Sequence, residues 1–505
     1  MTAATTESAT VDKTVFSIAC CVVLAVCLPL IFFPETAGTV TKMMYNWIAE
    51  YLGLVYQWAV IAMVGFLGWV AFGRFGAIRL GGDEARSEFS TFSWIAMIFA
   101  AGIGAGLMYW AGIEWGYYYQ NPPFRVEPRS LEALEWAGAY GLFHWGITAW
   151  AIFALPAVAI AYPYYNLKVP YLRLSTACHA LLGGRGENSW PGRLLDLVFM
   201  LGLIGGSATS LGLATPMISA FIATLLDIEV SMNLDVTVVV VCVLIFGGSA
   251  YLGLDKGIKR LSNINIVVAL SLLAFVLLAG PTLFILRVGA DSIGVMVSGL
   301  VRMLTWSDPV GRTNFVEDWT IFYWAWWIAY GPFTGLFVAR ISRGRTLKEL
   351  ILSMVAYGSM GCWIFFIIMG NYALFLELEG ILAVTEYLSA DQGPAAIAAI
   401  VATLPFSKLL LAGFTFVAVI SVATTYDSAS YTLASAASGE LRAGQNPARW
   451  HRLFWAAMLG MLPIALLTVG GLKVVQSAVL VASLPVLVVV ILMMFSLYRS
   501  LRENE

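Results

Sequence analysis

Long apolar runs recur along the whole chain, and short polar segments separate them. A helix needs about 20 mainly apolar residues to cross the hydrocarbon of a membrane, and twelve segments meet this requirement. They are residues 14–33, 52–73, 93–119, 138–163, 194–224, 233–254, 263–286, 318–340, 350–373, 408–437, 453–470 and 475–498. Several exceed the minimum length, so tilted or kinked helices are expected. The pattern predicts an all-α polytopic membrane protein with twelve transmembrane helices.

The distribution of charge agrees with an even number of spans. If both termini are cytoplasmic, eight of the 28 Lys and Arg residues fall in outside loops and the others fall inside. An excess of Lys and Arg in cytoplasmic loops is the usual orientation signal, and an odd number of spans would scramble it. We therefore expect a multi-pass protein of a bacterial inner membrane with cytoplasmic N- and C-termini.

Composition excludes an ordinary soluble protein. Hydrophobic residues make up 60% of the chain and charged residues 11%, against roughly 45–50% and about 25% in soluble domains. The three His residues show no nucleophile–base or metal-ligand spacing, so an enzyme is not expected. The net charge of −2 gives no sign of a nucleic acid partner.

Two of the predicted spans contain helix breakers. The third carries the run Ala100-Ala-Gly-Ile-Gly-Ala-Gly106, and the eighth carries Gly331-Pro332 directly after an aromatic cluster, Trp324 to Tyr330. Irregular backbone at membrane depth is tolerated where it lines a cavity, and aromatic faces attract a quaternary ammonium or sulfonium. The glycine run also has a simpler explanation, close helix packing through small residues.

The two interruptions have equivalent positions if spans 3–7 and 8–12 form two five-helix units. Five is odd, so the two units would insert with opposite orientation. Corresponding interruptions in inverted halves indicate the binding site of a transporter. The expected organisation is an N-terminal tail with two extra helices (1–92), a first repeat (93–287), an outside segment with an interfacial amphipathic helix (288–317), a second repeat (318–498) and a cytoplasmic tail (499–505).

Three motifs carry a family resemblance. They are Phe322-Tyr-Trp-Ala-Trp-Trp327, Ala339-Arg-Ile-Ser-Arg-Gly-Arg345 and Phe143-His-Trp-Gly146. With them the chain resembles the betaine/choline/carnitine transporters over nearly its full length. The segments Gly112-Ile-Glu114 and 210–216 resemble in particular the branch that exchanges carnitine for γ-butyrobetaine. The resemblance implies a LeuT-like 5+5 inverted repeat, a homotrimer surrounded by membrane lipid, and alternating access.

The resemblance also implies an aromatic substrate box. Its members would be Trp145, Trp326 and Trp327, with Tyr117 as in the exchanger branch and Trp150 as in the betaine branch. Phe153 and Tyr330 occupy two further positions, where the betaine branch has a tyrosine and a tryptophan. The alternative for each ring is packing or a place in the interfacial aromatic belt.

Two acids lie at or near membrane depth, where ionisable groups are functional or structurally paired. Glu114 precedes Tyr117 by three residues, on the same helix face, so it is expected to orient the box or contact a substrate hydroxyl. Asp427 is expected near the ion site. A purely structural pairing is the alternative for both acids.

The coupling ion implied by the resemblance is sodium. Thr424 and Thr425 align with the hydroxyl pair of sodium-coupled members, with backbone carbonyls near Ala100 and Ile103 as partners. Back-bonding of each threonine to its own helix is the alternative. The candidates for a second sodium site are Ser207, Ser210 and Phe333.

The residues at two further positions favour sodium symport over exchange. Sodium-independent exchangers carry an arginine where this chain has Asn265 and a methionine where it has Thr334. Asn cannot supply the fixed positive charge of Arg. Sodium-independent carnitine/γ-butyrobetaine exchange is the competing hypothesis, and a cation channel or receptor gated through the cage is the alternative outside transport.

The expected substrate is a small methylated zwitterion. Choline carriers of the family place an aspartate at the position of Gly106, so its absence here favours a ligand with its own carboxylate. Glycine betaine, carnitine, γ-butyrobetaine and dimethylsulfoniopropionate all fit. The N–H groups at the ends of unwound helices can hold such a carboxylate.

Overall fold

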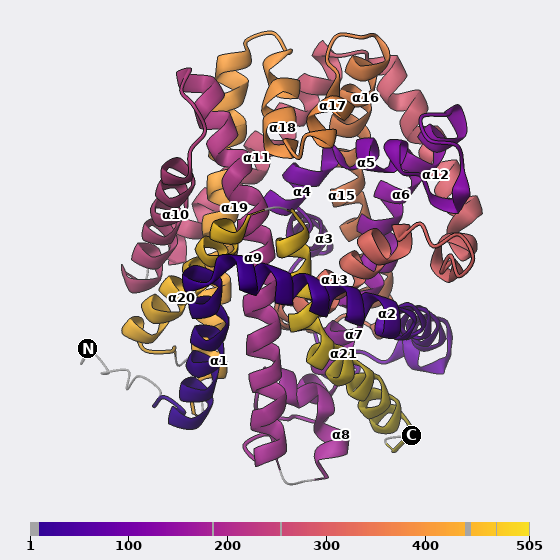
Figure 1. The fold of residues 1–505 in the computed structure, drawn as a ribbon. Helices are drawn as coiled ribbons and strands as arrows, with labels where there is room; N and C mark the ends of the chain where they lie inside the picture. Colours follow the sequence, from indigo (N-terminus) through magenta and orange to yellow (C-terminus); the bar gives the residue numbers. More distant parts are fainter. Residues whose placement is uncertain (1–9, 184–185, 253–254, 440–445, 471, 504–505) are drawn as a thin grey trace.

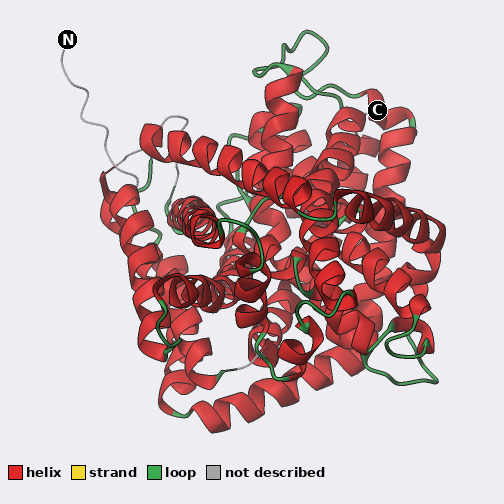
Figure 2. Cartoon of the chain, turned by 90° about the horizontal axis from the view of Figure 1, so that it is seen from above, coloured by secondary structure: helices red, strands yellow, loops and turns green. Residues whose placement is uncertain are grey.

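The computed structural model describes residues 10–183, 186–252, 255–439, 446–470 and 472–503. The first nine residues of the predicted N-terminal tail and the last two of the C-terminal tail lie outside this part of the chain. The described chain is helical almost throughout (Figure 2), and its β pairing is confined to two isolated bridges, Val11 with Ser438 and Arg79 with Thr346. The predicted all-helical class is confirmed.

Two helices precede the predicted repeats. Helix α1 (Lys13–Phe32) begins after Asp12, whose carboxylate accepts hydrogen bonds from the N–H groups of the first turn. Helix α2 (Pro34–Phe72) is 39 residues long, so it starts well before the predicted span 52–73. A proline at its first position suits a helix start. In Figure 1, α2 runs across the bundle at a steep angle to α9.

The third predicted span is broken, as expected. It consists of α3 (Thr91–Ala101), α4 (Ala105–Ala111) and α5 (Glu114–Gln120), with a bend of 63° between α3 and the rest. The break at Gly104 is extended, with φ −142° and ψ 170°. A glycine run costs helix stability and permits such a conformation.

The fourth predicted span contains a helix break that the sequence did not suggest. Helices α6 (Leu131–Trp145) and α7 (Ile147–Tyr165) meet at Gly146. A Cβ added there would lie 2.4 Å from Trp363 Nε1, so only glycine permits this approach. The break directly follows Trp145, a predicted box residue.

The boundary between the seventh span and the interfacial helix was predicted wrongly. Helices α10 (Met232–Leu252) and α11 (Asp255–Ala279) are followed by α12 (Thr282–Thr305). The chain breaks at Gly280-Pro281, because proline lacks an N–H and restricts the residue before it. The predicted domain boundary at 287/288 therefore falls inside α12.

The eighth predicted span is not broken at its Gly-Pro pair, contrary to expectation. A π-helical segment (Val316–Ile321) leads into α13 (Phe322–Ile341), which continues through Pro332. Neighbouring helices allow a membrane helix to accommodate proline. The glycines of α13 instead permit close packing: a Cβ added at Gly335 would lie 2.8 Å from Ala157 N of α7.

The remaining helices complete the bundle. They are α8 (His179–Leu182), α9 (Trp190–Leu226), α14 (Leu347–Ser353), α15 (Ser359–Phe365), α16 (Asn371–Leu378), α17 (Val384–Ser389), α18 (Gly393–Ala402), α19 (Ser407–Ala436), α20 (Arg449–Val469) and α21 (Leu472–Glu503). Two π-helical segments, 354–358 and 366–370, interrupt the ninth predicted span. In Figure 1, α1 begins and α21 ends at the lower end of the bundle.

Helix α9 lies at the centre of the bundle (Figure 1) and packs through small residues. A Cβ added at Gly202 or at Gly205 would lie 2.4 Å from Val486 or Ala482 of α21. Small residues at such contacts let membrane helices approach closely. The close contacts of α9 with α21 and of α13 with α7 therefore form a rigid frame for the broken span.

Ten described helices are long and apolar enough to cross a membrane, or eleven if α3–α5 count as one bent span. Helix α13 is not among them, because its Trp and Tyr side chains lower its mean hydropathy. Helix α12, which was predicted to be interfacial, is among the ten. The multi-pass membrane fold is confirmed, and the count of twelve spans stays a prediction.

Candidate substrate cavity

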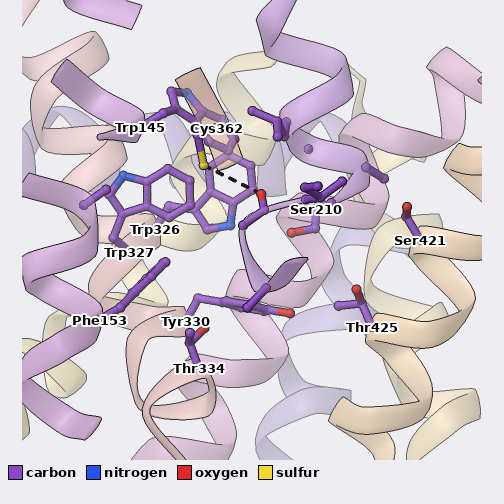
Figure 3. A pocket seen from close by; sticks show the side chains of 18 of the residues that line it. Trp145, Phe153, Ser210, Trp326, Trp327, Tyr330, Thr334, Cys362, Ser421 and Thr425 are labelled. Carbon is purple, nitrogen blue, oxygen red and sulfur yellow. Dashed lines mark hydrogen bonds between the residues drawn. The ribbon is translucent and has the colours of Figure 1, made fainter. Parts of the chain in front are cut away.

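A cavity of about 110 Å³ lies where the broken third span meets α7, α9, α13 and α19. Ala101, the last residue of α3, and the unwound residues 102–104 form part of its wall. Its aromatic lining residues are Trp145, Trp150, Phe153, Trp326, Trp327, Tyr330 and Tyr426. Figure 3 shows the labelled rings on one side and the hydroxyl groups of Ser210, Ser421 and Thr425 on the other. The described cavity has no charged side chain in its wall.

Three tryptophans form the centre of the aromatic wall. The rings of Trp326 and Trp327 stack with centroids 4.9 Å apart and an interplanar angle of 12°. Trp145 stands edge-on to both, 5.8 Å from Trp326 and 4.8 Å from Trp327. Phe153 adds a further perpendicular contact with Trp327 at 5.6 Å. The structure thus brings together the three tryptophans that the sequence motifs predicted as a box.

Hydrogen bonds behind the rings hold this geometry. Trp145 Nε1 donates to Glu114 Oε2 at 3.0 Å, and Trp327 Nε1 donates to the His144 carbonyl at 2.8 Å. Trp326 Nε1 donates to the Gly206 carbonyl at 3.2 Å. Buried tryptophans need such partners. Because all three indole N–H groups have partners outside the cavity lining, the rings offer it π surface and hydrocarbon.

Glu114 lies behind the aromatic wall, and it does not line the cavity as a substrate-binding residue would. It is fully buried and accepts hydrogen bonds from the hydroxyls of Tyr118 at 2.6 Å and Tyr323 at 2.5 Å. Sequence spacing suggested Tyr117 as its neighbour, but the i+4 residue Tyr118 makes the contact. Of the expected roles, orientation of the box fits this position.

Tyr117 lies outside the central cavity, unlike the other predicted box residues. Its ring is 5.3 Å from Trp319, and it lines a second cavity of about 760 Å³ together with Asp391 and Gln476. The bend in the third span explains the difference, since α5 no longer continues the axis of α3. Tyr117 is therefore placed beside, and not within, the tryptophan box.

Trp150 has a packing role in addition to its edge on the cavity. Its ring lies between two glycines: a Cβ added at Gly102 or Gly358 would lie 2.9 or 2.1 Å from ring atoms. Cys362, which sequence reasoning missed, lines the cavity beside this contact, with its Sγ 3.7 Å from the Gly102 carbonyl (Figure 3). Its position in an apolar run gave no signal of this role.

The two predicted sodium threonines face different directions. Thr425 lines the cavity, as do Ser210, Ile103 and Thr334. Thr424 is not in the lining, and its hydroxyl donates to the Ile420 carbonyl at 2.9 Å on its own helix. Back-bonding, the alternative considered for both residues, therefore holds for Thr424.

The other sodium candidates lie outside the cavity lining. The Ala100 carbonyl accepts the Ile103 N–H at 3.1 Å. Phe333 packs against Tyr330 at 5.1 Å. Ser207 is buried, its carbonyl accepts the Tyr426 hydroxyl, and its Oγ has no hydrogen-bond partner in the described chain.

The polar groups beside the cavity fit a small hard cation. Asn265 Nδ2 donates to Ser421 Oγ at 2.8 Å, while its buried Oδ1 has no hydrogen-bond partner among the described residues. Ser421 and Thr425 both line the cavity, and their hydroxyls are oxygen groups of the kind that sodium requires. Asp427 instead lies 3.7 Å from Arg452, so the structural pairing considered for it is found.

A broken span that faces an aromatic cage inside packed membrane helices defines a multi-pass membrane transporter for a small solute. Residues 14–505 match the family described as BCCT, betaine/carnitine/choline family transporter, and the chain belongs to this family.

Two relatives extend the match. A carnitine transporter of Acinetobacter baumannii is 36% identical over 451 residues, which cover 89% of this chain and 81% of that protein. The uncharacterized transporter YeaV of Escherichia coli K12 is 34% identical over 446 residues, covering 88% and 92%. Family and relatives indicate a membrane transporter and not an enzyme.

Proposed function

We propose that the protein takes up a small zwitterion with a quaternary-ammonium or sulfonium head, of the glycine betaine, carnitine or dimethylsulfoniopropionate type, by sodium symport. The observation that carries the proposal is the cage of Trp145, Trp326 and Trp327. All three indoles line one small cavity. Indole π surface attracts a methylated cation through the ring quadrupole and still accepts its methyl groups.

The charge of the cavity wall supports a zwitterion over a simple cation. The described lining has no acidic side chain that would contact a cation such as choline directly. Residues Ala105 to Leu107 begin α4 beside the cage, and no side chain caps this helix start. Free N–H groups at a helix start attract a carboxylate. The two ends of the ligand thus have separate, complementary partners.

Sodium coupling is supported by the oxygen groups on the other side of the cavity. Thr425, Ser421 and Ser210 would hold the ion with backbone carbonyls of the unwound segment. When bound, sodium supplies positive charge near the substrate carboxylate. Asn265 and Thr334 carry no fixed charge that replaces an ion. The bend between α3 and α4 supplies the hinge for alternating access.

The decisive experiment measures uptake of radiolabelled glycine betaine and carnitine into proteoliposomes, with and without an inward sodium gradient. We expect uptake to fall to background without sodium. Thr425→Ala should raise the sodium concentration for half-maximal uptake about tenfold or more, whereas the neighbouring Thr424→Ala, whose hydroxyl faces its own helix, serves as the matched control. Sodium-indifferent uptake that requires preloaded substrate would establish exchange and contradict symport.

The setting of this function is also part of the proposal: a homotrimer in the bacterial inner membrane, with both termini cytoplasmic. The long helix α2 supports subunit or lipid contact, because Met43, Trp47, Tyr51 and Trp58 are exposed on it. Large exposed apolar faces are unusual on surfaces that meet water. Native mass spectrometry of the detergent-purified protein should give three copies, and a monomer mass would contradict this assembly.

A further inference from the structure

A buried polar cluster lies directly behind the tryptophan cage. Glu114 is at its centre, with Tyr118, Tyr323, His144 and Thr320 around it, and all five side chains are buried. Tyr118 OH also lies 2.8 Å from His144 Nδ1, and His144 Nε2 lies 2.9 Å from Thr320 Oγ1. Such a cluster inside packed membrane helices is costly unless it is fully hydrogen bonded or has a function.

The contacts of Glu114 can all be made by an ionised carboxylate. Three donors reach its two oxygens, from Trp145, Tyr118 and Tyr323. The indole N–H can only donate, and an ionised carboxylate only accepts. These contacts favour the charged form of the group.

This charge has no permanent cation beside it. In the described chain, no Lys or Arg lies within ion-pair distance of Glu114. The neighbouring side chain that could become a cation is His144, with Nδ1 at 3.8 Å. A neutral imidazole satisfies both contacts of His144, because the hydroxyls of Tyr118 and Thr320 can each donate or accept. A buried carboxylate without a cation is strongly unfavourable, and such a group takes up a proton instead. A cation bound in the neighbouring cage would therefore favour the ionised form of Glu114.

Trp145 connects this charge to the cavity. Its N–H contacts Glu114, and its ring lies in the cavity wall beside Trp326 and Trp327. An anion that accepts from an indole N–H polarises the ring and makes its π face more negative, as hydrogen-bonded groups polarise one another. The attraction of that face for a cation rises accordingly.

We propose that Glu114 provides the counter-charge for the cationic head of the substrate, transmitted through the indole of Trp145. Glu114 is then a positioning and specificity-determining residue that never touches the substrate. It makes the cage select a positively charged head over an uncharged head of the same shape. The inference rests on the proposed function, since it requires a methylated cation in the cage.

The test compares two ligands that differ in charge and not in shape. Glycine betaine carries a trimethylammonium group, and 3,3-dimethylbutyrate carries a tert-butyl group in its place. Purified protein is titrated with each ligand in the presence of sodium, and the ratio of the two dissociation constants is taken. We expect Glu114→Gln to reduce the preference for betaine about tenfold or more, with little change for the isostere. Glu114→Asp keeps the charge and should retain the preference, even if both affinities fall.

A purely structural role predicts a different pattern. If Glu114 only holds the ring of Trp145 in place, Glu114→Gln weakens both ligands equally, and the proposal is overturned. Tyr323→Phe removes an uncharged donor and keeps the carboxylate, so it should leave the ratio unchanged. A ratio that falls there as far as in Glu114→Gln also overturns the proposal.

One further variant and one control keep the test decisive. If the Gln variant is not recovered folded, Trp145→Phe removes the N–H that links the charge to the ring, and the betaine preference has to fall there. An unchanged ratio in that variant contradicts the inference. Wild-type protein that binds neither ligand overturns the proposed function together with this one, whereas equal losses in Glu114→Gln overturn this inference alone.

Discussion

The guanidinium of Arg345 lies over the indole ring of Trp94, 4.6 Å from its centroid. Trp94 lies in the first turn of α3, and Arg345 follows the C-terminal end of α13. The start of one helix that lines the cavity therefore contacts the end of another. Trp94 Nε1 also donates to Ser342 Oγ at 3.1 Å. The motif 339–345 therefore has a structural role: it connects the C-terminal end of α13 to the N-terminal end of the broken third span.

Replacement of Arg345 by Lys is expected to destabilise this connection. Arg345 donates to Thr91 Oγ1 and to the Phe89 carbonyl, each at 3.0 Å, and its planar group stacks on Trp94. A lysine ammonium cannot reproduce this fork and stack. We expect a loss of about 1–3 kcal/mol of stability, measured as a lower Tm in detergent. Arg343→Lys, at an exposed position of the same loop, should leave Tm unchanged; equal shifts in both variants would contradict a specific role for Arg345.

Two tryptophans of α13 offer a matched test of the cage. Trp327 lines the cavity, whereas Trp324 is fully buried and lies outside the lining. Trp327→Phe removes part of the π surface and the bond to the His144 carbonyl. The apparent KM for betaine-type substrates should rise about tenfold or more, as the loss of a desolvated cation–π contact implies. Trp324→Phe should change protein yield or Tm more than KM, and the reverse result would place the substrate elsewhere.

The contact between Gly358 and Trp150 leaves no room for a side chain. A Cβ at Gly358 would lie 2.1 Å from Trp150 Cδ2. Gly358→Ala therefore has to displace either the Trp150 ring or the π-helical segment 354–358 that contains Gly358. Overpacking of this kind costs about 1–3 kcal/mol, and displacement of Trp150 should also reduce the rate of uptake. Gly65→Ala is the control, because its Cβ would meet no atom within 4 Å. If Gly358→Ala keeps the uptake rate and the Tm of the wild type, the structure accommodates the Cβ without cost, and the prediction is contradicted.

The sequence predicted those parts of the site that depend on local pattern. The glycine run after Ala100 predicted the break in the third span. The aromatic motifs predicted that Trp326 and Trp327 lie in one wall with Trp145. The Gly-Pro pair of the eighth span was predicted to break the helix, and this was wrong. Glycine permits a neighbouring helix to pack closely as readily as it permits unwinding. Packing against α7 determines that the helix stays intact here, and the contacting residues of α7 are about 180 positions away in the chain.

Long-range contacts set the parts that could not be predicted. Tyr323 reaches Glu114 across 209 positions of sequence, and no local spacing encodes that meeting. Tyr118 was within reach of prediction, since i+4 pairs share a helix face. Cys362 enters the cavity wall from a span with two π-helical segments. Each extra residue per π turn rotates the following side chains, so helical periodicity alone assigns the wrong face.

The loop after α12 contains a buried acid, Asp308, that makes stability depend on pH. Asp308 accepts hydrogen bonds from the Thr313 N–H at 2.9 Å and its hydroxyl at 2.8 Å, and forms an ion pair with Arg125 at 3.1 Å. Burial by itself raises the pKa of Asp308, but these bonds outweigh it, and the pKa lies below its ordinary value.

A depressed carboxyl pKa contributes stability above the unfolded value of about 3.9, and this contribution is lost as the pH falls through the folded pKa. Asp308→Asn should therefore lower Tm at pH 7, by an amount that corresponds to about 1–2 kcal/mol after allowance for the exposed arginine. The gap between wild type and variant should narrow as the pH is lowered below 4, because the wild-type carboxyl then also becomes neutral. Glu127→Gln, at an exposed acid in the loop before α6, serves as control. A gap that stays constant from pH 7 to pH 3 would mean that the charge of Asp308 has no part in holding this loop.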